Sequence, residues 1–155
     1  MKNILFVAIA AAVLAGAFGV RQLRAEENDR VAFPHGYENG VHYATVNRGG
    51  IREELFTSRA AAEAAKRGLP LPEGTVIMLE DHRQGRLYRY VVMEKRAGWG
   101  NAYPEDIRNG DWDYREFRAD KTPNPAEDGT RCLACHKSQA GNDFVFTYDR
   151  LRAAR

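Results

Sequence analysis

Near its C-terminal end the sequence has two cysteines separated by two residues and followed at once by a histidine, Cys132-Leu133-Ala134-Cys135-His136. Thiols at this spacing lie about one helical turn apart, so both can reach the vinyl groups on one edge of a porphyrin. The adjacent His136 then lies under the ring, where its imidazole can ligate iron. The motif therefore predicts one covalently attached haem c, with Cys132 and Cys135 as thioether anchors and His136 as axial iron ligand.

Three other uses of the cysteine pair are compatible with this spacing. They are a thioredoxin-like redox pair, half of a zinc site, and a structural disulfide beside a chance histidine. The sequence has two cysteines in all, so no second pair completes a four-cysteine zinc site, and no β-α-β pattern precedes the motif. Haem attachment agrees best with the export signal at the other end of the chain.

The N-terminal region has the three parts of a secretory signal peptide. Lys2 is a short positive start, residues 4–20 form an apolar run without a charge, and Leu23 and Ala25 suit the positions before a cleavage site. We therefore expect a signal peptide at 1–25 and export to a bacterial periplasm. An uncleaved membrane anchor is the alternative, although a run of 17 residues is near the lower limit for spanning a bilayer.

Length and charge narrow the class of protein. Of the 155 residues, about 130 remain after removal of the leader, which suits a single domain. The leader carries three of the 23 basic residues, so the remainder has 20 basic and 21 acidic side chains and a net charge of about −1. Such a domain lacks the basic excess typical of nucleic-acid binding, and we expect no nucleic-acid partner.

Hydrophobic patterning predicts an α+β fold. Runs rich in β-branched and aromatic residues, several with alternating polarity, predict an antiparallel sheet of about five strands with a few helices. The strands are expected at 41–47, 51–56, 74–80, 87–94 and 112–118. A polar hairpin turn is expected at 83–85. The resulting domain organisation is a lead-in loop at 26–40 and a haem domain at 41–155.

Helices are expected at three places. Thr57 or Ser58 can cap a helix over 59–67, an alanine-rich run that a glycine and then a proline bring to an end. The cysteine motif is expected to open a second helix. Residues 143–147 then lead into a last helix that ends near Arg152.

Over residues 41–152 the chain resembles the cytochrome P460 and cytochrome c′-beta superfamily. The matching segments are Pro-Glu-Gly-Thr-Val at 72–76, Gly-Asp-Trp-Asp-Tyr at 110–114, Cys-Leu-Ala-Cys-His-Lys at 132–137 and Asp-Phe-Val-Phe-Thr at 143–147. The resemblance implies an antiparallel sheet that carries a single c-type haem. It also implies His136 as the proximal ligand and a distal side that is open or capped by apolar groups.

One residue departs from the pattern of cytochrome P460 itself. In that protein a lysine on the strand after the Gly-Thr segment bonds covalently to the porphyrin, and hydroxylamine oxidation is associated with the modified haem. Aligned from Gly74 and Thr75, this position falls on Leu79, which cannot form such a bond. The resemblance therefore favours the cytochrome c′-beta side, whose members bind nitric oxide, and places Leu79 on the distal haem face.

Other side chains were weighed as iron ligands. Met78 or Met93 as sixth ligand would make the protein a low-spin electron carrier, but both also suit core packing. Strand alternation turns Met78 away from the haem if Leu79 faces it. Lys95 could in principle reach the porphyrin ring, but we expect a solvated side chain. The three remaining histidines, expected on strands or in a loop away from the iron, are His35, His42 and His82.

Several aromatic and acidic residues are candidates for the haem surroundings. The aromatic candidates for lining the cavity are Trp99, Trp112, Tyr114, Phe144 and Phe146. The carboxylates weighed as proton donors or acceptors, with solvated surface groups as the default, are Glu80, Glu94 and Glu105.

Three functions follow from these observations. The first is binding of a small gaseous or nitrogen-oxide ligand such as nitric oxide, the second is electron transfer with a redox partner protein, and the third is oxidation of hydroxylamine. A homodimer is compatible with the sequence.

Overall fold

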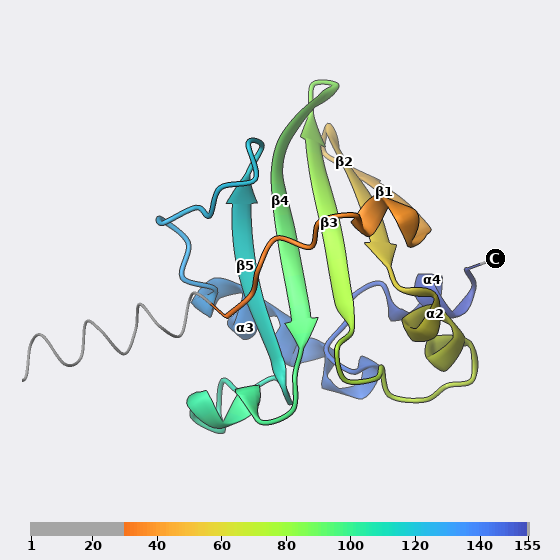
Figure 1. Cartoon of the computed structure of the whole chain (residues 1–155), viewed down its shortest axis with the longest axis vertical. Helices are drawn as coiled ribbons and strands as arrows, with labels where there is room; N and C mark the ends of the chain where they lie inside the picture. The colour runs from red at the N-terminus through yellow and green to blue at the C-terminus, as the bar shows by residue number, and fades with distance from the viewer. Residues whose placement is uncertain (1–29, 155) are drawn as a thin grey trace, which may run out of the picture. The chain divides into compact units, whose positions relative to one another are not determined.

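A five-stranded sheet is the framework of the described part of the chain (Figure 1). The computed structural model describes residues 30–154, so the expected signal peptide lies outside the described residues. The strands are β1 (Val41–Arg48), β2 (Ile51–Thr57), β3 (Val76–Arg83), β4 (Arg86–Lys95) and β5 (Trp112–Arg118). They lie side by side in chain order, and each neighbouring pair is antiparallel, which confirms the predicted α+β fold.

Tight turns join the first four strands in pairs. Between β3 and β4, Gln84 and Gly85 both have positive φ, 51° and 75°, and Arg83 pairs with Arg86. This is the geometry of a two-residue primed turn, whose twist matches that of the flanking strands. The polar hairpin turn predicted at this place is confirmed.

The helices are short and lie outside the sheet. They are α2 (Arg59–Lys66), α3 (Thr130–His136) and α4 (Tyr148–Arg152), with the 3₁₀ helices η1 (Tyr37–Asn39), η2 (Trp99–Ala102) and η3 (Lys137–Asn142). Helix α2 begins as predicted, because the Ser58 hydroxyl accepts a hydrogen bond of 3.1 Å from the Ala61 amide.

Helix α3 starts earlier than expected. The cysteine motif was expected to open a helix, but α3 begins at Thr130 and His136 is its last residue. Gly129 sets this start, because its φ of 79° is left-handed and an added Cβ would lie 2.8 Å from the Tyr114 carbonyl oxygen. Because of this close approach the start of α3 packs against β5, so the cysteine motif lies over the sheet.

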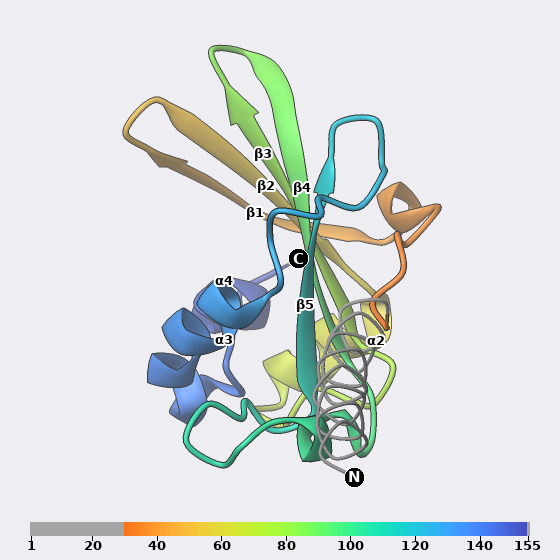
Figure 2. The ribbon, with the colours of Figure 1, turned by 90° about the vertical axis from the view of Figure 1, so that its left-hand side faces the viewer.

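The two faces of the sheet carry separate cores (Figure 2). Helices α3 and α4 lie over one face, where Leu133, Tyr148 and Leu151 join the alanines of α2 in one buried cluster. Residues 31–40, expected as a lead-in loop, run across the other face. There Val31 is 1% exposed and Phe33 packs edge-on against Tyr90 and Phe117, so this segment belongs to a core.

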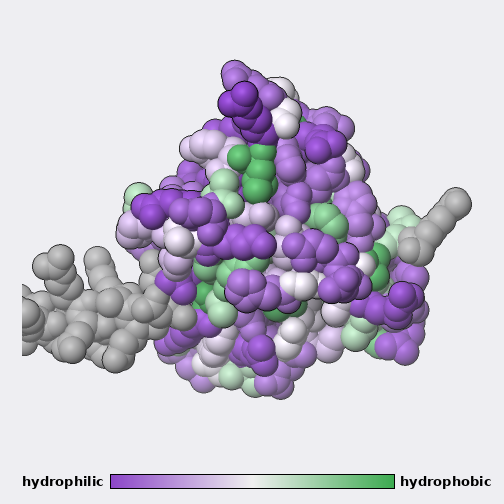
Figure 3. Space-filling model, turned by 45° about the horizontal axis from the view of Figure 1, so that its top comes forward, coloured by the Kyte–Doolittle hydropathy of each residue, from purple (hydrophilic) through white to green (hydrophobic). Residues whose placement is uncertain are grey.

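The side of the unit that carries residues 31–40 is covered mainly by polar and charged side chains, with small apolar areas between them (Figure 3). No helix within residues 30–154 has the length and apolar character needed to cross a bilayer.

Candidate functional site

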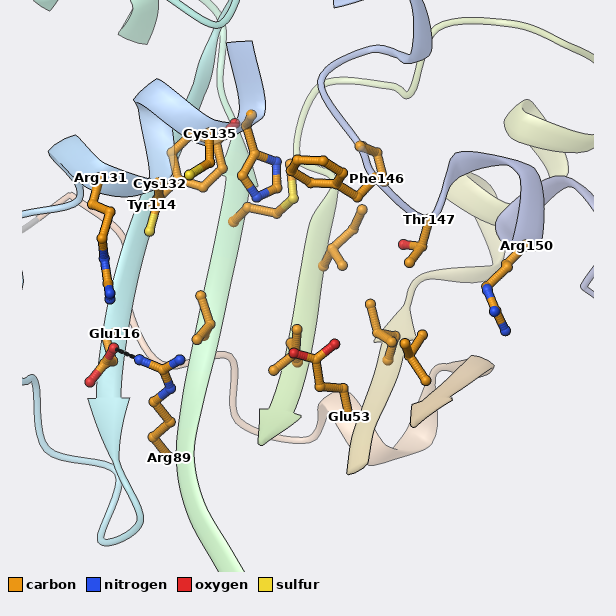
Figure 4. A pocket seen from close by; sticks show the side chains of 18 of the residues that line it. Glu53, Arg89, Tyr114, Glu116, Arg131, Cys132, Cys135, Phe146, Thr147 and Arg150 are labelled. Atoms are coloured by element: carbon orange, nitrogen blue, oxygen red, sulfur yellow. Dashed lines mark hydrogen bonds and ion pairs between the residues drawn. The ribbon is translucent and has the colours of Figure 1, made fainter. Parts of the chain in front are cut away.

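A cavity of about 580 Å³ lies between the sheet and the C-terminal segments that cover it (Figure 4). This volume falls within the roughly 300–1,000 Å³ typical of cofactor and small-molecule sites. Its walls come from β1 to β5, from α3, from the segment before α4 and from α4 itself. The lining residues are Val46, Arg48, Glu53, Leu55, Ile77, Leu79, Arg89, Val91, Met93, Tyr114, Glu116, Arg131, Cys132, Cys135, His136, Val145, Phe146, Thr147 and Arg150.

Strand pairing arranges the floor of the cavity in three rows that cross the sheet. The rows are Ile77–Met93–Tyr114, Leu55–Leu79–Val91 and Glu53–Asp81–Arg89. Alternate residues of a strand share a face, so all three rows point to the side of the helices. The floor is therefore apolar near α3 and charged in its third row. Its middle row is aliphatic over Leu55, Leu79 and Val91 and ends at Glu116 on β5.

Helix α3 brings the predicted anchor and ligand residues to this cavity. Cys132, Cys135 and His136 all line it, and both thiols are free. Burial raises the pKa of Cys132 to about 11. Redox-active and other reactive thiols have a lowered pKa, so this environment does not suit a thioredoxin-like pair.

The His136 ring is held in a defined tautomer. Its Nδ1 lies 2.6 Å from the Phe144 carbonyl oxygen, and because a carbonyl only accepts, Nδ1 carries the proton. Burial lowers the pKa of His136 although this hydrogen bond opposes the shift. The ring is therefore neutral, with Nε2 as the basic nitrogen, which is the form that ligates a metal. Tyr114 and Phe146 hold the ring, with centroids 4.8 and 4.9 Å away.

Four arginines and two glutamates line the cavity in addition to the apolar floor. Arg48 pairs with Glu53, and Arg89 pairs with Glu116, the pair drawn in Figure 4. The other two cations are Arg131, which pairs with Glu127 at 3.0 Å, and Arg150, whose Nη1 lies 3.4 Å from the Thr45 carbonyl oxygen. These cations can neutralise acidic groups of a bound molecule.

The residues present fit a covalently bound haem. Two free thiols and a neutral imidazole lie at a cavity with an aliphatic floor, and the Arg150 guanidinium, which bonds a neutral carbonyl, is available for a porphyrin carboxylate. Phe146 lines this cavity with 56% of its surface exposed, so an apolar ring faces the open space. An apolar macrocycle would cover it.

The structure separates the two methionines. Leu79 lines the cavity, whereas Met78 is 1% exposed and belongs to the core on the opposite face, as strand alternation predicted. Met93 does line the cavity and is 6% exposed. The remaining histidines lie elsewhere: His35 lines a second cavity on the opposite face, His42 pairs with Glu54, and His82 pairs with Glu80.

The prediction that Lys95 is a solvated side chain is wrong. Its ammonium group forms an ion pair with Asp143, 2.8 Å from Oδ2, and the Lys95 side chain is 18% exposed. The partner carboxylate lies 48 residues further along the chain, so local sequence could not reveal the pair.

Of the aromatic candidates, Tyr114 and Phe146 line the cavity. Trp112 and Phe144 pack in the adjoining core, and Trp99 packs on the other face. None of the three carboxylates considered as proton donors or acceptors lines the cavity. Glu80 accepts a hydrogen bond from the Tyr37 hydroxyl, Glu94 pairs with Arg96, and Glu105 is exposed. The lining carboxylates Glu53 and Glu116 were missed, although alternation with Leu55 places Glu53 on the same face.

The charged third row predicts a pH dependence of stability. Burial by itself would raise the pKa of Asp81, but hydrogen bonds from Arg83 and Arg89 outweigh it and the pKa is lowered. Asp81 is 1% exposed, so we expect Asp81→Asn to lower the free energy of unfolding by about 2 kcal/mol at pH 7.

A folded pKa below the unfolded value of about 4 means that the stabilisation is present above pH 4 and is lost as the pH falls toward the folded pKa. Denaturant unfolding between pH 3 and pH 7 should therefore show the wild-type advantage shrinking below about pH 4. A difference that stays constant down to pH 3 would contradict the assignment.

Comparison with known proteins identifies the family. A search of curated proteins finds no match to the chain. The family model described as Cytochrome P460 matches residues 34–147, more than half of the chain, from the segment on the second face of the sheet to the residue before α4. The matched region includes all five strands, the cysteine motif and the segment that holds His136, and the chain therefore belongs to the cytochrome P460 family.

Proposed function

We propose that this haem cytochrome is an exported protein that binds nitric oxide, or a nitrogen-oxide ligand of similar size, at the iron of a single haem c. Cys132 and Cys135 anchor the haem and His136 is its axial ligand. The observation that carries the proposal is the position of Leu79, in the middle of the aliphatic row that faces the cavity beside His136.

An aliphatic row selects among small ligands. Bound dioxygen accumulates negative charge and needs a hydrogen-bond donor nearby, whereas nitric oxide depends much less on one. Leu55, Leu79 and Val91 offer no donor, and the charged row beyond them is engaged in ion pairs. A site with this floor should favour nitric oxide over dioxygen.

The chain itself supplies binding, orientation and exclusion of water. The haem iron, when present, provides the ligand-binding centre. The Phe144 carbonyl keeps the proton of His136 on Nδ1, so that the lone pair of Nε2 stays available to ligate iron. The aliphatic row keeps water from the middle of the cavity, while the arginines of the cavity can hold the haem carboxylates.

A His/Met electron carrier is the second candidate, because Met93 lines the cavity and its thioether is a known axial ligand type. Oxidation of hydroxylamine has less support, since no lysine is among the described residues that line the cavity. The second candidate predicts low-spin ferric haem with a methionine–iron absorption band, and the third predicts turnover with an electron acceptor.

The test is an optical study of the purified, exported protein. We expect haem that resists extraction by acid-acetone, an ordinary c-type pyridine haemochrome, a high-spin ferric spectrum and ready nitric oxide binding by the ferrous form. Freely extractable haem would overturn the attachment. A low-spin ferric spectrum with the methionine band, or rapid oxidation of hydroxylamine, would replace nitric oxide binding by the corresponding alternative.

A further inference from the structure

The turn after η3 has a backbone conformation that side chains rarely adopt. Asp143 has φ 50° and ψ 38°, and Phe144 has φ 61°, so two successive residues other than glycine are left-handed. Such positions are energetically unfavourable and persist where surrounding contacts hold them. For a bulky residue such as Phe144 the conformation is an outlier.

Four hydrogen bonds to the Asp143 carboxylate hold this turn. The Leu71 amide donates to Oδ2 at 2.8 Å, the Trp112 indole donates to Oδ1 at 3.3 Å, and Lys95 donates to both oxygens at 2.9 and 2.8 Å. Lys95 also donates to the Leu71 carbonyl at 3.0 Å. The carboxylate is thus tied to three separate parts of the framework, namely the loop before β3, the end of β4 and the start of β5.

The turn determines where the Phe144 carbonyl points. The Phe144 amide donates to the Gln139 carbonyl at 2.8 Å, and the Phe144 ring packs against Gly110. The carbonyl of the same residue then accepts the 2.6 Å bond from His136 Nδ1. This carbonyl belongs to the peptide unit that joins Phe144 to Val145, and the Val145 amide of that unit donates to the Asn142 carbonyl at 3.0 Å. The left-handed Phe144 and this hydrogen bond fix the direction of the acceptor, and both belong to the turn that the Asp143 carboxylate holds.

We propose that Asp143, neutralised by Lys95, is a positioning residue for His136. The Asp143–Lys95 ion pair holds the left-handed turn, and the turn aims the Phe144 carbonyl at Nδ1. This bond sets the rotation of the imidazole and raises the basicity of Nε2, as hydrogen bonds to the second nitrogen of a ligating histidine do. The inference rests on the proposed function, in which His136 ligates the haem iron.

The decisive variants change the Asp143–Lys95 ion pair, here called the clamp, and leave the residues that line the cavity unchanged. Asp143→Asn keeps the size and removes the charge, and Lys95→Met removes the cation. Neither residue lines the cavity. The double variant Lys95→Met/Asp143→Asn removes both charges together, so no buried ion is left without a partner if a single variant folds poorly. Lys95→Arg should behave like the wild type because it keeps the positive charge.

A matched control lies at the neighbouring position of β4. Glu94 is 7% exposed and pairs with Arg96 at 2.7 Å, but it pairs across the sheet with Val76, whose side chain packs in the opposite core. Glu94→Gln therefore removes a charge that is more buried than Lys95, on the same strand, without a path to His136.

The readouts are the iron–imidazole stretching band in the resonance Raman spectrum of the ferrous protein and the reduction potential, each normalised to haem content. We expect Asp143→Asn and the double variant to shift the band to lower frequency and the potential to more positive values, since a weaker Nδ1 bond makes Nε2 a poorer donor. Glu94→Gln and Lys95→Arg should keep both at wild-type values.

Two results would contradict the proposal in distinguishable ways. Wild-type band and potential in Asp143→Asn and in the double variant, with haem retained, would show that the clamp serves packing alone and would overturn this inference only. A wild-type protein with five-coordinate high-spin ferrous haem but without any iron–imidazole band would overturn the assignment of His136, and with it the proposed function.

Discussion

A His136→Gly variant should retain its haem but lose the iron–imidazole bond completely, and added imidazole should restore that bond. Cys132 and Cys135 hold the haem independently of His136 in the proposed site, so removal of the side chain leaves the attachment in place. The space vacated between Tyr114 and Phe146 is lined by rings at 4.8 and 4.9 Å from the former imidazole centroid, which suits a free imidazole.

The measurement is the ferrous resonance Raman spectrum, recorded with and without an excess of imidazole, after haem content has been equalised. His42→Ala is the matched control. His42 lies on the edge strand β1, pairs with Glu54 of β2 and does not line the cavity. Retention of the wild-type iron–imidazole band in His136→Gly would mean that another residue ligates the iron.

Leu79→Lys should change the ferric spectrum and weaken ferrous nitric oxide binding at least about tenfold, which corresponds to ~1.4 kcal/mol. Leu79 lies between Leu55 and Val91 in the aliphatic row, so a lysine there extends its amine into the cavity. In this apolar setting the neutral amine is favoured and can approach the porphyrin or compete for the iron. The same substitution restores the residue type at the aligned position of cytochrome P460 itself.

Leu79→Ile is the control, since it keeps the side-chain volume and should leave the spectrum and the nitric oxide affinity unchanged. Peptide mass spectrometry of Leu79→Lys then reports whether the new lysine becomes bonded to the haem. An unchanged spectrum with the haem retained would show that position 79 does not face the ring, and the aliphatic-row argument would fail with it.

The sheet was predictable because its signals are local. Enrichment in β-branched and aromatic residues, with alternation in several runs, located all five strands to within a few residues, and the serine before α2 marked the start of that helix. The family resemblance assigned Leu79 to the haem side, and strand alternation then turned Met78 to the other face, as the structure has them. The start of α3 was misjudged, because the close approach of Gly129 to the Tyr114 carbonyl is a tertiary contact.

The charged residues around the site were harder to predict, because polar patterning marks solvent-facing positions and these side chains lie on the inner face. Glu53 was overlooked for this reason, and so was Glu116 on β5. Lys95 was assigned to solvent because its partner Asp143 lies on a distant segment. Where ion pairs form across a sheet or between distant segments, composition and periodicity carry no information about them.

The chain order of the strands in the sheet has a consequence for the order in which parts of the protein fold. Each strand pairs with its neighbour in the chain, so loop closure costs little and the sheet can form early, before the C-terminal segments dock. Those segments make long-range contacts instead: Asp143 bonds Leu71 across 72 residues, and Tyr43 bonds Thr147 across 104. The cysteine motif directly precedes these segments, so we expect it to settle over the sheet only after the strands have paired. In the proposed site, this order leaves Cys132 and Cys135 accessible for haem attachment before α3 and α4 dock.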